Sequence, residues 1–362
     1  MGEIITEYKE TVDSDCTLPI LTSYKTEGVI LQEEHFGRKQ QHDITGYNIL
    51  PRNYCTYRNR SDGVDFTFNI NKCCDKGIIS KFYPVFSGNN SDVFFLSLVL
   101  NNSEEVVHEI AYTCTGTGQK VLSFLDLQKM KVRVPGFDEQ KKIAAYFDDL
   151  DHLITLHQRK CEDTKKLKKY MLQKMFPQNG SKVPEIRFKG FTDDWEQRKV
   201  GDITKELSEY AKLNSGLPLL TSARTGLMYQ SDYRGNSTTD NENTLFSIVP
   251  LNACTYRHMS DDSTFHINVN TLEKGLVSKE YPVFVENESD LRFVVQYINS
   301  SDSFTKFCTE QKKGGTRTRL YYKTLCEYKM LIPSLNEQHI IADYFDNLDY
   351  LITLHQREYS TW

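Results

Sequence analysis

The sequence predicts an α+β protein with a pseudo-two-fold internal repeat, in which two similar globular α/β domains are separated by two long helices packed as an antiparallel coiled coil. Three observations lead to this fold class. The chain has 362 residues, enough for about two domains of roughly 150 residues each. Residues 139–160 recur as residues 337–358, with 16 of 22 positions identical. Both segments carry apolar residues at the spacings of a coiled-coil helix.

Composition and charge narrow the class of protein. Hydrophobic residues make up 39% of the chain and charged residues 26%, as in an ordinary globular protein. No apolar run reaches the roughly 18 residues of a membrane helix, so we expect a cytoplasmic protein without a membrane partner. The nine cysteines show no C-x-x-C spacing, which argues for reduced thiols and against a zinc site. Because the net charge is -5, any binding to DNA would depend on local basic faces and not on the charge of the whole chain.

The repeat extends upstream of the helices. Two further blocks keep their order at offsets of 198 or 199, namely 53–58 with 252–257 and 76–86 with 274–284. Residues 24–49 and 223–248 have instead diverged almost completely. A period this long indicates a duplicated domain with its tail rather than a solenoid. We therefore expect the tails to share one task and the globular parts to perform two different ones.

Within each globular part, the pattern predicts strands and then an ambiguous segment. Residues 65–71 and 264–270 alternate polar and apolar side chains at period 2, which predicts half-buried strands. Residues 91–100 and their counterparts fit either a buried strand or a short helix, because periodicity does not separate the two. A glycine-containing loop and a proline, Pro135 or Pro333, then end each globular part.

After these prolines the pattern becomes helical. Asp138 and Asn336 are the expected N-caps, each followed by Glu-Gln in the first turn. No glycine or proline interrupts residues 138–176, so one helix of about 39 residues would be roughly 58 Å long. The expected seam of the spacer helices, which we also expect to dock partners, consists of Ile143, Phe147, Leu150 and Ile154 in the first helix and Ile341, Phe345, Leu348 and Ile352 in the second. An apolar stripe on a helix must be buried against another surface, and we expect the stripe of the other spacer helix to be that surface.

These patterns place four segments along the chain: a first globular domain at 1–135, a central spacer helix at 136–177, a second globular domain at 178–333 and a short C-terminal spacer helix at 334–362. The second helix stops at Trp362, which aligns with Thr164 of the first. It therefore has no counterpart of residues 165–176. Nor does the first domain have a counterpart of residues 188–200.

The motifs at the two helices carry a family resemblance. They comprise the doubled Pro-x-x-(Asp/Asn)-Glu-Gln-x-x-Ile-Ala-x-Tyr-Phe-Asp-x-Leu-Asp-x-Leu-Ile opening, the close of the central helix at 168–177, and the segment 184–191 with Trp195. With these motifs in this order, the chain resembles the specificity subunit of a type I restriction-modification system over essentially its whole length. The resemblance implies two target recognition domains that each read one half of a split double-stranded DNA site, with the helices as a ruler between them.

The resemblance also implies a subunit that is not itself a catalyst. Adenine-N6 methyltransferase subunits, two of them, would dock on the helical region, and restriction subunits would complete the cleaving complex. S-adenosylmethionine and ATP with Mg would belong to those partners, so no cofactor is expected in this chain. Self-association through the helices is a further contact that the repeated tails allow.

Candidate DNA contacts lie in two segments of each repeat. The basic loop 312–319 supplies Lys312, Lys313, Arg317 and Arg319, and its less basic counterpart supplies Gln119 and Lys120. The second segment supplies Tyr57, Arg58 and Arg60 in the first copy, and Tyr256 and Arg257 in the second. Arginine can grip guanine or phosphate bidentately, and glycines let the backbone approach a phosphate. Each segment has a structural alternative: an exposed hairpin for the loops, and the end of a core strand for the repeated Tyr-Arg.

Two features of the helices have ordinary structural explanations. The basic run 159–174 could contact phosphates or a methyltransferase, but a solvated helix face explains it at least as well. His157 and His355 fall in the seam, where packed histidines are more common than metal ligands.

The search for catalytic motifs finds none. The sequence has no Asn/Asp-Pro-Pro-Tyr/Phe methyltransferase motif, no G-x-S-x-G, no H-E-x-x-H and no G-x-G-x-x-G after a strand. We therefore expect no catalytic residue, no metal site and no enzymatic activity in the chain alone. Two alternatives stay open: a non-catalytic protein-binding scaffold with duplicated coiled-coil tails, and a fused enzyme without recognisable motifs. A steep salt dependence of DNA binding would separate a DNA reader from the scaffold.

Overall fold

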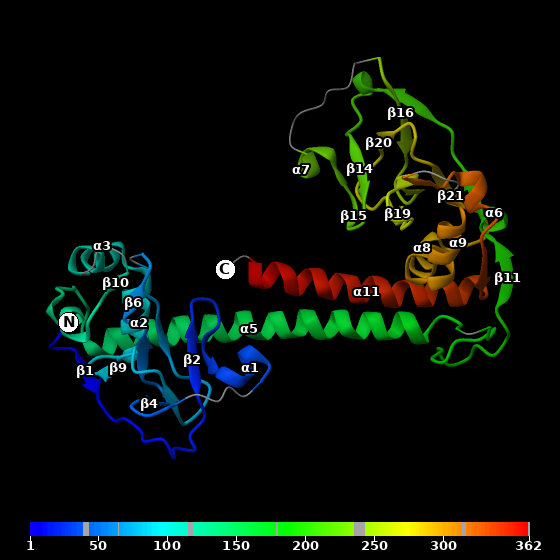
Figure 1. The fold of residues 1–362 in the computed structure, drawn as a ribbon. Coiled ribbons are helices and arrows are strands. Elements are labelled where there is room, and N and C mark those ends of the chain that lie inside the picture. Colours follow the sequence, from blue (N-terminus) through cyan, green and yellow to red (C-terminus); the bar gives the residue numbers. More distant parts are fainter. Residues whose placement is uncertain are drawn as a thin grey trace. The chain divides into compact units, whose positions relative to one another are not determined.

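A computed structural model describes residues 1–38, 43–63, 65–114, 119–178, 180–234, 243–312 and 316–360. The chain divides into two compact units, Met1–Leu153 and Ile154–Trp362 (Figure 1). The division falls inside one long helix, so the segment expected to form a separate central spacer contributes to both units. Each unit combines a small antiparallel sheet with covering helices, and this is the α+β class that the sequence predicts.

The centre of unit 1 is a four-stranded antiparallel sheet. Its strand order is β1 (Ile5–Tyr8), β9 (Val85–Gly88), β5 (Cys55–Tyr57) and β7 (Phe68–Ile70). Helix α2 (Val93–Asn102) packs on β7, and α3 (Glu104–Thr113) packs on α2. The core between them includes Phe68, Phe86 and Leu96, which are completely buried. Burial of each such side chain contributes about 1.5–3 kcal/mol to stability.

Three two-stranded ribbons and two short helices accompany this sheet. The ribbons are β2 (Leu21–Tyr24) with β3 (Gly28–Leu31), β4 (Asn48–Pro51) with β8 (Lys76–Ile79), and β6 (Arg60–Ser61) with β10 (Lys120–Val121). The short helices are α1 (Gln32–Phe36) and α4 (Phe124–Lys129). A second small core, which includes Leu21, Leu50 and Ile79, joins the first two ribbons.

Unit 2 repeats the central sheet of unit 1 strand by strand. Its four-stranded sheet has the order β12 (Thr204–Glu206), β21 (Val283–Glu286), β17 (Cys254–Thr255) and β19 (Asn268–Val269). Helices α8 (Leu291–Ser300) and α9 (Asp302–Glu310) correspond to α2 and α3. The buried core includes Phe284, Phe293 and Trp195. The sequence repeat is therefore a repeat of topology as well.

The remaining elements of unit 2 are short. Paired strands are β14 (Leu220–Ala223) with β15 (Gly226–Tyr229), β18 (Met259–Ser260) with β22 (Thr318–Arg319), and β11 (Glu196–Lys199) with β23 (Lys329–Ile332). A three-stranded sheet contains β13 (Tyr210–Lys212), β16 (Leu245–Val249) and β20 (Gly275–Ser278). The short helices are α6 (Val200–Ile203), the 3₁₀ turn Leu213–Ser215, α7 (Gln230–Arg234) and α10 (Tyr322–Leu325).

The segment that periodicity left ambiguous is helical in both units. The Asp92 side chain accepts a hydrogen bond from the Phe95 amide at 2.9 Å and so caps α2. Asp290 caps α8 in the same way through the Arg292 amide at 2.9 Å. Such N-caps stabilise a helix by roughly 1 kcal/mol. The strands predicted at 65–71 and 264–270 are confirmed in type but are shorter, since β7 and β19 cover only residues in the second half of each range.

A repeated buried asparagine explains part of the sequence repeat. Asn71 Nδ2 donates to the Leu50 carbonyl at 3.0 Å, and Asn270 Nδ2 donates to the Val249 carbonyl at 3.1 Å. Both asparagines are completely buried. A buried amide without partners would cost free energy, so these bonds account for the same residue type at the same place in both units.

Two long helices follow the sheet domains, α5 (Phe137–Lys174) and α11 (Leu335–Ser360). The expectation that Asp138 and Asn336 are N-caps is wrong, because each is the second residue of its helix. Ser334 precedes α11 instead, and its Oγ accepts from the Glu337 amide at 3.5 Å. Asp138 and Asn336 therefore lie in the first turns of their helices. The helix dipole favours the negative charge of Asp138 at this position.

Inside unit 2, the second half of α5 runs antiparallel to α11 (Figure 1). Three contacts join the two helices: His157 Nδ1 to His355 Nδ1 at 3.2 Å, Cys161 Sγ to the Ile352 carbonyl at 3.9 Å, and Lys168 Nζ to Asp349 Oδ1 at 2.7 Å. Residue numbers rise along α11 as they fall along α5, which defines the antiparallel direction. The predicted pairing of the two helices is confirmed over this stretch.

The Glu-Gln pair after each proline ties the helix start to its own sheet domain. Gln140 Nε2 donates to the Pro135 carbonyl at 2.8 Å, and Gln338 Nε2 donates to the Pro333 carbonyl at 2.9 Å. The side-chain oxygens of both glutamines accept from the amides of the residues that cap α2 and α8, at 3.1 Å and 3.0 Å. Because both glutamines are buried, this doubled motif anchors each long helix to the sheet domain before it.

Candidate nucleic-acid interface

In both units a short ribbon brings together the two segments that the sequence suggests as DNA contacts. In unit 1, β6 pairs with β10, so Lys120 faces Ser61 next to Arg60. In unit 2, β18 pairs with β22, so Arg319 faces Met259. Side chains that lie far apart in the sequence therefore share one ribbon in each unit.

Tyr57 and Tyr256 are completely buried, so the expectation that they contact DNA is wrong. Tyr57 Oη donates to the Leu122 carbonyl at 3.1 Å, and Tyr256 Oη donates to the Leu320 carbonyl at 3.1 Å. Burial raises the pKa of both phenols. Each tyrosine fastens the second ribbon strand to the central sheet, and this structural role explains why the tyrosine recurs.

The basic surface beside the ribbon of unit 1, called ribbon surface 1, consists of Lys25, Arg58, Arg60, Gln119 and Lys120. Lys25, Arg58 and Arg60 line a hollow of about 270 Å³. Arg58 is exposed and forms no ion pair with any residue in the part of the chain that the structure describes. The guanidinium carbon of Arg60 lies 4.6 Å from the centre of the Phe82 ring, a cation–π contact that orients the arginine.

Two carboxylates moderate the charge of ribbon surface 1. Lys25 Nζ lies 2.5 Å from Asp65 Oδ2, and Gln119 Nε2 donates to Asp62 Oδ1 at 3.3 Å. Both carboxylates also line the hollow. A phosphate approaching this surface would therefore meet Arg58, Arg60 and Lys120, which form no ion pair with any carboxylate in the described ranges.

The equivalent basic surface of unit 2, called ribbon surface 2, consists of Arg224, Arg257, Arg317 and Arg319. Arg317 Nε donates to Asp261 at 2.8 Å, and a terminal nitrogen of Arg224 lies 2.5 Å from Asp262. Arg257 and Arg319 are exposed and form no ion pair within the described ranges. Lys312 is also exposed, just after α9, and no hydrogen bond or ion pair among the described residues joins it to the ribbon. Lys313 lies outside the described residues.

Asp262 is the acceptor that organises ribbon surface 2. It accepts hydrogen bonds from Arg224, from the Ser260 hydroxyl at 2.7 Å and from the Thr264 amide at 3.0 Å. These bonds, that from Arg224 first, hold the pKa of the Asp262 carboxyl well below its usual range. The carboxylate therefore stays ionised and keeps Arg224 in place.

Sequence reasoning missed Lys25 and Arg224. They lie 199 residues apart in the stretch that has otherwise diverged between the repeats. The loop that carries each of them is held by a repeated bond: Asn69 Nδ2 donates to the Tyr24 carbonyl at 2.9 Å, and Asn268 Nδ2 to the Ala223 carbonyl at 2.8 Å. A basic residue kept at this offset was the pattern that could have identified both.

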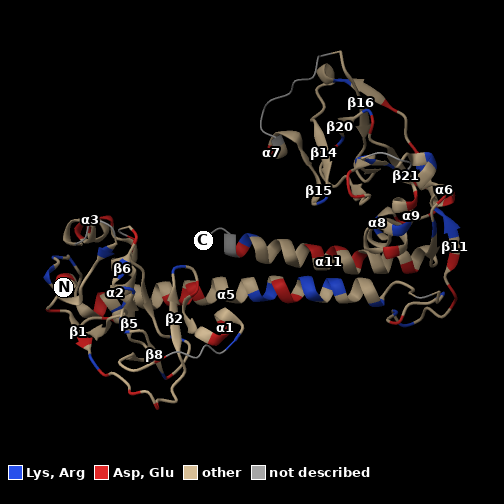
Figure 2. Cartoon of the chain, viewed as in Figure 1, with Lys and Arg blue, Asp and Glu red and all other residues tan. Residues whose placement is uncertain are grey.

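Lys and Arg residues also recur along the second half of α5, which Figure 2 colours blue. Four of these lysines lie beside a carboxylate: Lys165 beside Glu162 at 2.8 Å, Lys166 beside Asp163 at 3.8 Å, Lys168 beside Asp349 at 2.7 Å and Lys174 beside Glu185 at 2.5 Å. Most of these side chains are well exposed, and exposed pairs contribute little to stability. The pairing favours the solvated helix face over a phosphate-binding stripe.

The expected seam residues occupy different environments in the two units. Ile341, Phe345 and Leu348 are buried in the core of unit 2, and Ile352 lies half-buried against Cys161. In α5, Ile143, Leu150 and Ile154 are half-buried, whereas Phe147 is 43% exposed. The repeated seam is therefore covered at the start of α11 and partly open at the start of α5.

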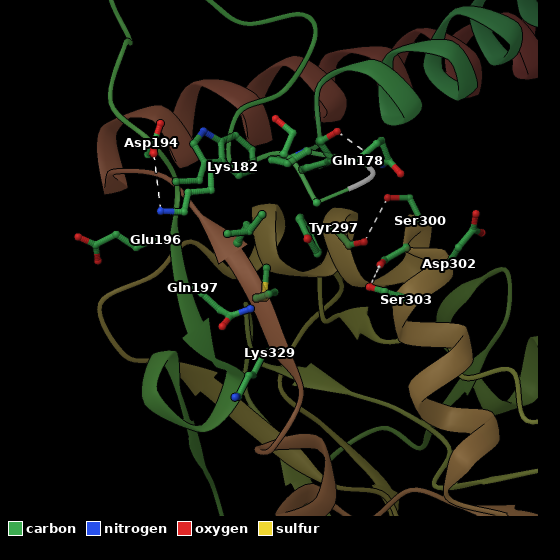
Figure 3. Close-up of a pocket in the computed structure, with 18 residues that line it drawn as sticks. Gln178, Lys182, Asp194, Glu196, Gln197, Tyr297, Ser300, Asp302, Ser303 and Lys329 are labelled. Atoms are coloured by element: carbon green, nitrogen blue, oxygen red, sulfur yellow. Dashed lines mark hydrogen bonds and ion pairs between the residues drawn. The ribbon is translucent and has the colours of Figure 1, made fainter.

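A cavity of about 950 Å³ lies in unit 2 next to the buried Trp195 (Figure 3). Its lining mixes charges of both signs, with Lys182, Lys329, Asp194 and Glu196 among them, and Lys182 lies 3.8 Å from Asp194. None of the candidate DNA contacts that the structure describes lines it. Among the described residues, no group of three His, Cys, Asp or Glu side chains is arranged to hold a metal ion. No helix of these residues is long and apolar enough to cross a membrane.

Comparison of the sequence with protein families and with known proteins identifies similar proteins. The sequence profile of the family described as type I restriction modification DNA specificity domain matches residues 45–165 and again residues 261–361, which together exceed half of the chain. A protein of Methanocaldococcus jannaschii named as the MjaX type I restriction enzyme specificity subunit is 25% identical over 272 residues. That match covers 66% of this chain and 57% of the relative, so the chain spans well under two thirds of the relative's length.

A solved structure shares the fold. The crystal structure of the type I restriction-modification system S subunit from M. genitalium aligns with a TM-score of 0.57 at 11% identity, covering 99% of this chain and 91% of that one. At this identity the likeness concerns the fold alone. The family profile, however, matches each half of the chain separately, and the two matched segments contain the two ribbons described above in whole or in part. The chain belongs to the family of type I restriction modification DNA specificity domains.

Proposed function

We propose that this chain is the DNA-reading subunit of a type I restriction-modification complex and that each unit reads one half of a bipartite double-stranded DNA target. Ribbon surfaces 1 and 2 would face the DNA. Arginines on phosphates would set the position of each unit, and contacts to base edges in the major groove would set the sequence. The divergence of the two surfaces means that the two half-sites differ in sequence.

One observation carries this proposal: the same ribbon is built twice, on the same sheet order, with different charged side chains. Ribbon surface 1 offers Arg58 and Arg60, and ribbon surface 2 offers Arg257 and Arg319. The buried tyrosine beneath each ribbon recurs together with the exposed arginine after it, whereas the paired residues of the ribbons differ: Arg60 with Val121 in unit 1, and Met259 with Arg319 in unit 2. A common scaffold with variable exposed residues is what two reading heads of different specificity require.

The same proposal assigns the chemistry to partners. Two adenine-N6 methyltransferase subunits would bind S-adenosylmethionine and transfer the methyl group, and restriction subunits would use ATP with Mg. This chain would bind DNA, dock those subunits through its helical region and contribute no catalytic group. It requires no cofactor of its own in this scheme.

The salt dependence of DNA binding tests the assignment of the ribbon surfaces. We would measure affinity for duplex DNA as a function of salt for the chain assembled with its methyltransferase subunits. Two double variants, Arg58→Ala with Arg60→Ala and Arg257→Ala with Arg319→Ala, should each reduce the slope of log K against log salt by about 2, since each phosphate contact contributes about 0.9. The control is Lys166→Ala on the exposed face of α5, which should leave the slope unchanged.

Two results would count against the proposal. Equal slopes for the double variants and the control would remove the ribbons from the DNA interface, and binding without salt dependence would favour the protein-binding scaffold. Methyl transfer to DNA by the isolated chain with S-adenosylmethionine would contradict the non-catalytic role.

A further inference from the structure

One position of the repeat leaves a buried polar atom without a hydrogen bond in both units. Asn59 Oδ1 in unit 1 and His258 Nδ1 in unit 2 are buried and bond to no other described residue. The two residues are equivalent, because each directly follows the repeated Tyr-Arg pair. Buried polar atoms are normally hydrogen-bonded, so an unpaired one calls for an explanation. In unit 2 the unpaired atom belongs to a side chain that titrates near neutral pH.

His258 lies where the chain passes from the central sheet of unit 2 to ribbon surface 2. It follows Arg257 and directly precedes β18, and it is only 3% exposed. Its carbonyl accepts a hydrogen bond from the Leu320 amide at 2.9 Å. Arg319, the residue before Leu320, belongs to the ribbon strand β22. Two exposed arginines that form no ion pair in the described ranges therefore flank one buried imidazole.

The groups around the imidazole of His258 set its charge. Glu280 Oε2 lies 3.7 Å from His258 Nε2, and the Glu280 side chain is 69% exposed. The Tyr321 ring stacks on the imidazole, with ring centres 5.8 Å apart. Burial lowers the pKa of His258, Glu280 opposes this shift, and the positive charges of Arg319 and Arg257 add to it. The ring is therefore mainly neutral at neutral pH in the chain without DNA.

A proton added at Nδ1 of His258 would break no existing hydrogen bond. A neutral imidazole has one nitrogen that carries hydrogen and one bare nitrogen. Because Nε2 faces the Glu280 carboxylate, we assign the hydrogen to Nε2 and the bare position to the unpaired Nδ1. Burial and repulsion by the two arginines then keep the ring neutral. A DNA phosphate bound to those arginines would add negative charge, offset the repulsion and favour the protonated ring.

We propose that His258 takes up a proton when duplex DNA binds to ribbon surface 2, with Glu280 as the counter-ion of the protonated ring. The DNA-bound chain then holds more protons than the free chain. By linkage, its affinity for DNA rises as pH falls through the range in which His258 titrates. This inference rests on the proposed function, because it requires ribbon surface 2 to face DNA.

Unit 1 has neither the titrating group nor the counter-ion at the equivalent positions. Asn59 replaces the histidine, and Phe82 stands where unit 2 has Glu280. The guanidinium of Arg60 lies over the Phe82 ring instead. An asparagine side chain does not titrate in this pH range. The two units would therefore respond differently to pH although their central sheets have the same strand order, and lower pH would strengthen the DNA contacts of unit 2 alone.

The pH profile of DNA affinity tests the proposal. The probe is a fluorescent random-sequence duplex, titrated at constant salt with the chain assembled with its methyltransferase subunits. Between about pH 8 and about pH 5.5, the affinity of wild type should rise about three-fold or more beyond that of His258→Asn. This variant carries the residue that unit 1 has at the same position. His266, which also titrates near Arg224 and Asp262, is present in both chains, so its contribution cancels.

Further variants change the surroundings of the ring without changing the ring. Glu280→Gln removes the counter-ion at an exposed position and should move the rise in affinity to lower pH. Its control is Glu327→Gln, an exposed carboxylate that pairs with Lys199, which should leave the pH profile unchanged. Arg257→Ala with Arg319→Ala should reduce the salt slope by about 2 and give the pH profile of His258→Asn. Thermal unfolding of each variant checks that the fold is kept.

The pH profile and the salt slope together separate failure of this inference from failure of the proposed function. Parallel pH profiles of wild type and His258→Asn, with a reduced salt slope in the double arginine variant, would overturn the inference and leave the proposed function standing. An unchanged salt slope in that double variant would remove ribbon surface 2 from the DNA interface and overturn both. If His258→Asn does not fold, Glu280→Gln decides, because an unshifted pH profile of that variant would contradict proton uptake by His258.

Discussion

At positions 57 and 256, a buried tyrosine hydroxyl donates to a backbone carbonyl of the neighbouring ribbon, 3.1 Å away in each unit. The arginine that follows each tyrosine is exposed. Neighbouring residues of one repeated motif thus have different tasks: the tyrosine holds the ribbon, and the arginine is available to a partner. Repetition in the sequence alone could not separate these tasks, because both residues recur together.

The first prediction separates these two tasks by mutation. Tyr57→Phe leaves the Leu122 carbonyl without its donor and should lower the free energy of unfolding by about 1–3 kcal/mol, with no change in the salt slope of DNA binding. Arg58→Ala should do the reverse, with stability within about 0.5 kcal/mol of wild type and a slope smaller by about 1. Chemical denaturation and salt titration measure the two effects. A Tyr57→Phe chain of unchanged stability would contradict the structural role.

The second prediction concerns the histidine pair between α5 and α11. With the two Nδ1 atoms 3.2 Å apart, at least one ring must be neutral to accept the hydrogen bond. Burial, and then the nearby charges of His157 and Lys160, lower the pKa of His355, while Glu358 opposes this shift. The unfolded chain therefore binds the proton more readily, so the pair should lose stability as pH falls from about 6.5 towards the lowered pKa.

Thermal unfolding at pH 8, 6.5 and 5 measures this effect. The wild-type melting temperature should fall more steeply below pH 6.5 than that of His355→Gln, which has no proton to gain at this position. Wild type and His355→Gln differ in no titratable side chain except His355. The difference between their melting temperatures at each pH therefore reports on the histidine pair. Identical pH profiles would show that the histidine contact does not affect stability.

At the scale of elements, the start of α11 depends on an ion pair that the sequence did not reveal. Arg187 and Glu337 are 150 residues apart, and they form two hydrogen bonds while nearly buried. The third prediction follows from their burial. Arg187→Met should lower the free energy of unfolding by about 3–5 kcal/mol, because it leaves a buried carboxylate without a partner.

The control for that prediction is an exposed ion pair in the same unit. Lys199→Met, which removes the partner of Glu327 at 2.7 Å, should change stability by no more than about 1 kcal/mol. The double variant Arg187→Met with Glu337→Met should regain much of the loss, since no buried charge remains. Equal destabilisation by Arg187→Met and Lys199→Met would contradict the buried pair.

Element types were largely predictable, and element lengths were not. The 4-and-3 spacing predicted α5 and α11 to within two residues at their starts, because a long apolar stripe has only one regular explanation. The strands β7 and β19 are shorter than the alternating pattern. The amides of Phe68 and Ile267 donate to the side-chain oxygens of Asn101 and Asn299 and not to a neighbouring strand. The ambiguous apolar segments became α2 and α8, and their aspartate caps were the local feature that could have decided it.

At the scale of the whole molecule, the internal repeat was the most informative property of the sequence. It predicted two parts of the same topology, and the structure shows the same strand order in both central sheets, while the family profile matches two separate segments of the chain. The candidate site was predicted only in part. Both ribbon segments were identified, but Tyr57 and Tyr256 proved to be buried and Lys25 and Arg224 were missed, because exposure and contact depend on tertiary packing that no local pattern encodes.

A single continuous helix, α5, contributes to both units, with Ala144 packed in unit 1 and Leu172 in unit 2. If each unit reads one half-site, this shared element should keep the gap between the half-sites constant. A change of one base pair in the gap rotates one half-site by about 35° around the duplex, given about 10 base pairs per turn. The fourth prediction is therefore that DNA targets with one base pair added or removed in the gap lose high-affinity binding.

Mapping methylated adenines is the most direct test of the proposal that each unit reads one half of a bipartite DNA target. The chain would be assembled with its methyltransferase subunits, incubated with S-adenosylmethionine and a large random DNA library, and the N6-methyladenines located by sequencing. The account predicts that every modified site consists of two short defined blocks separated by an undefined gap of one length. Methylation at one uninterrupted short sequence, or at paired blocks with freely varying gaps, would contradict it.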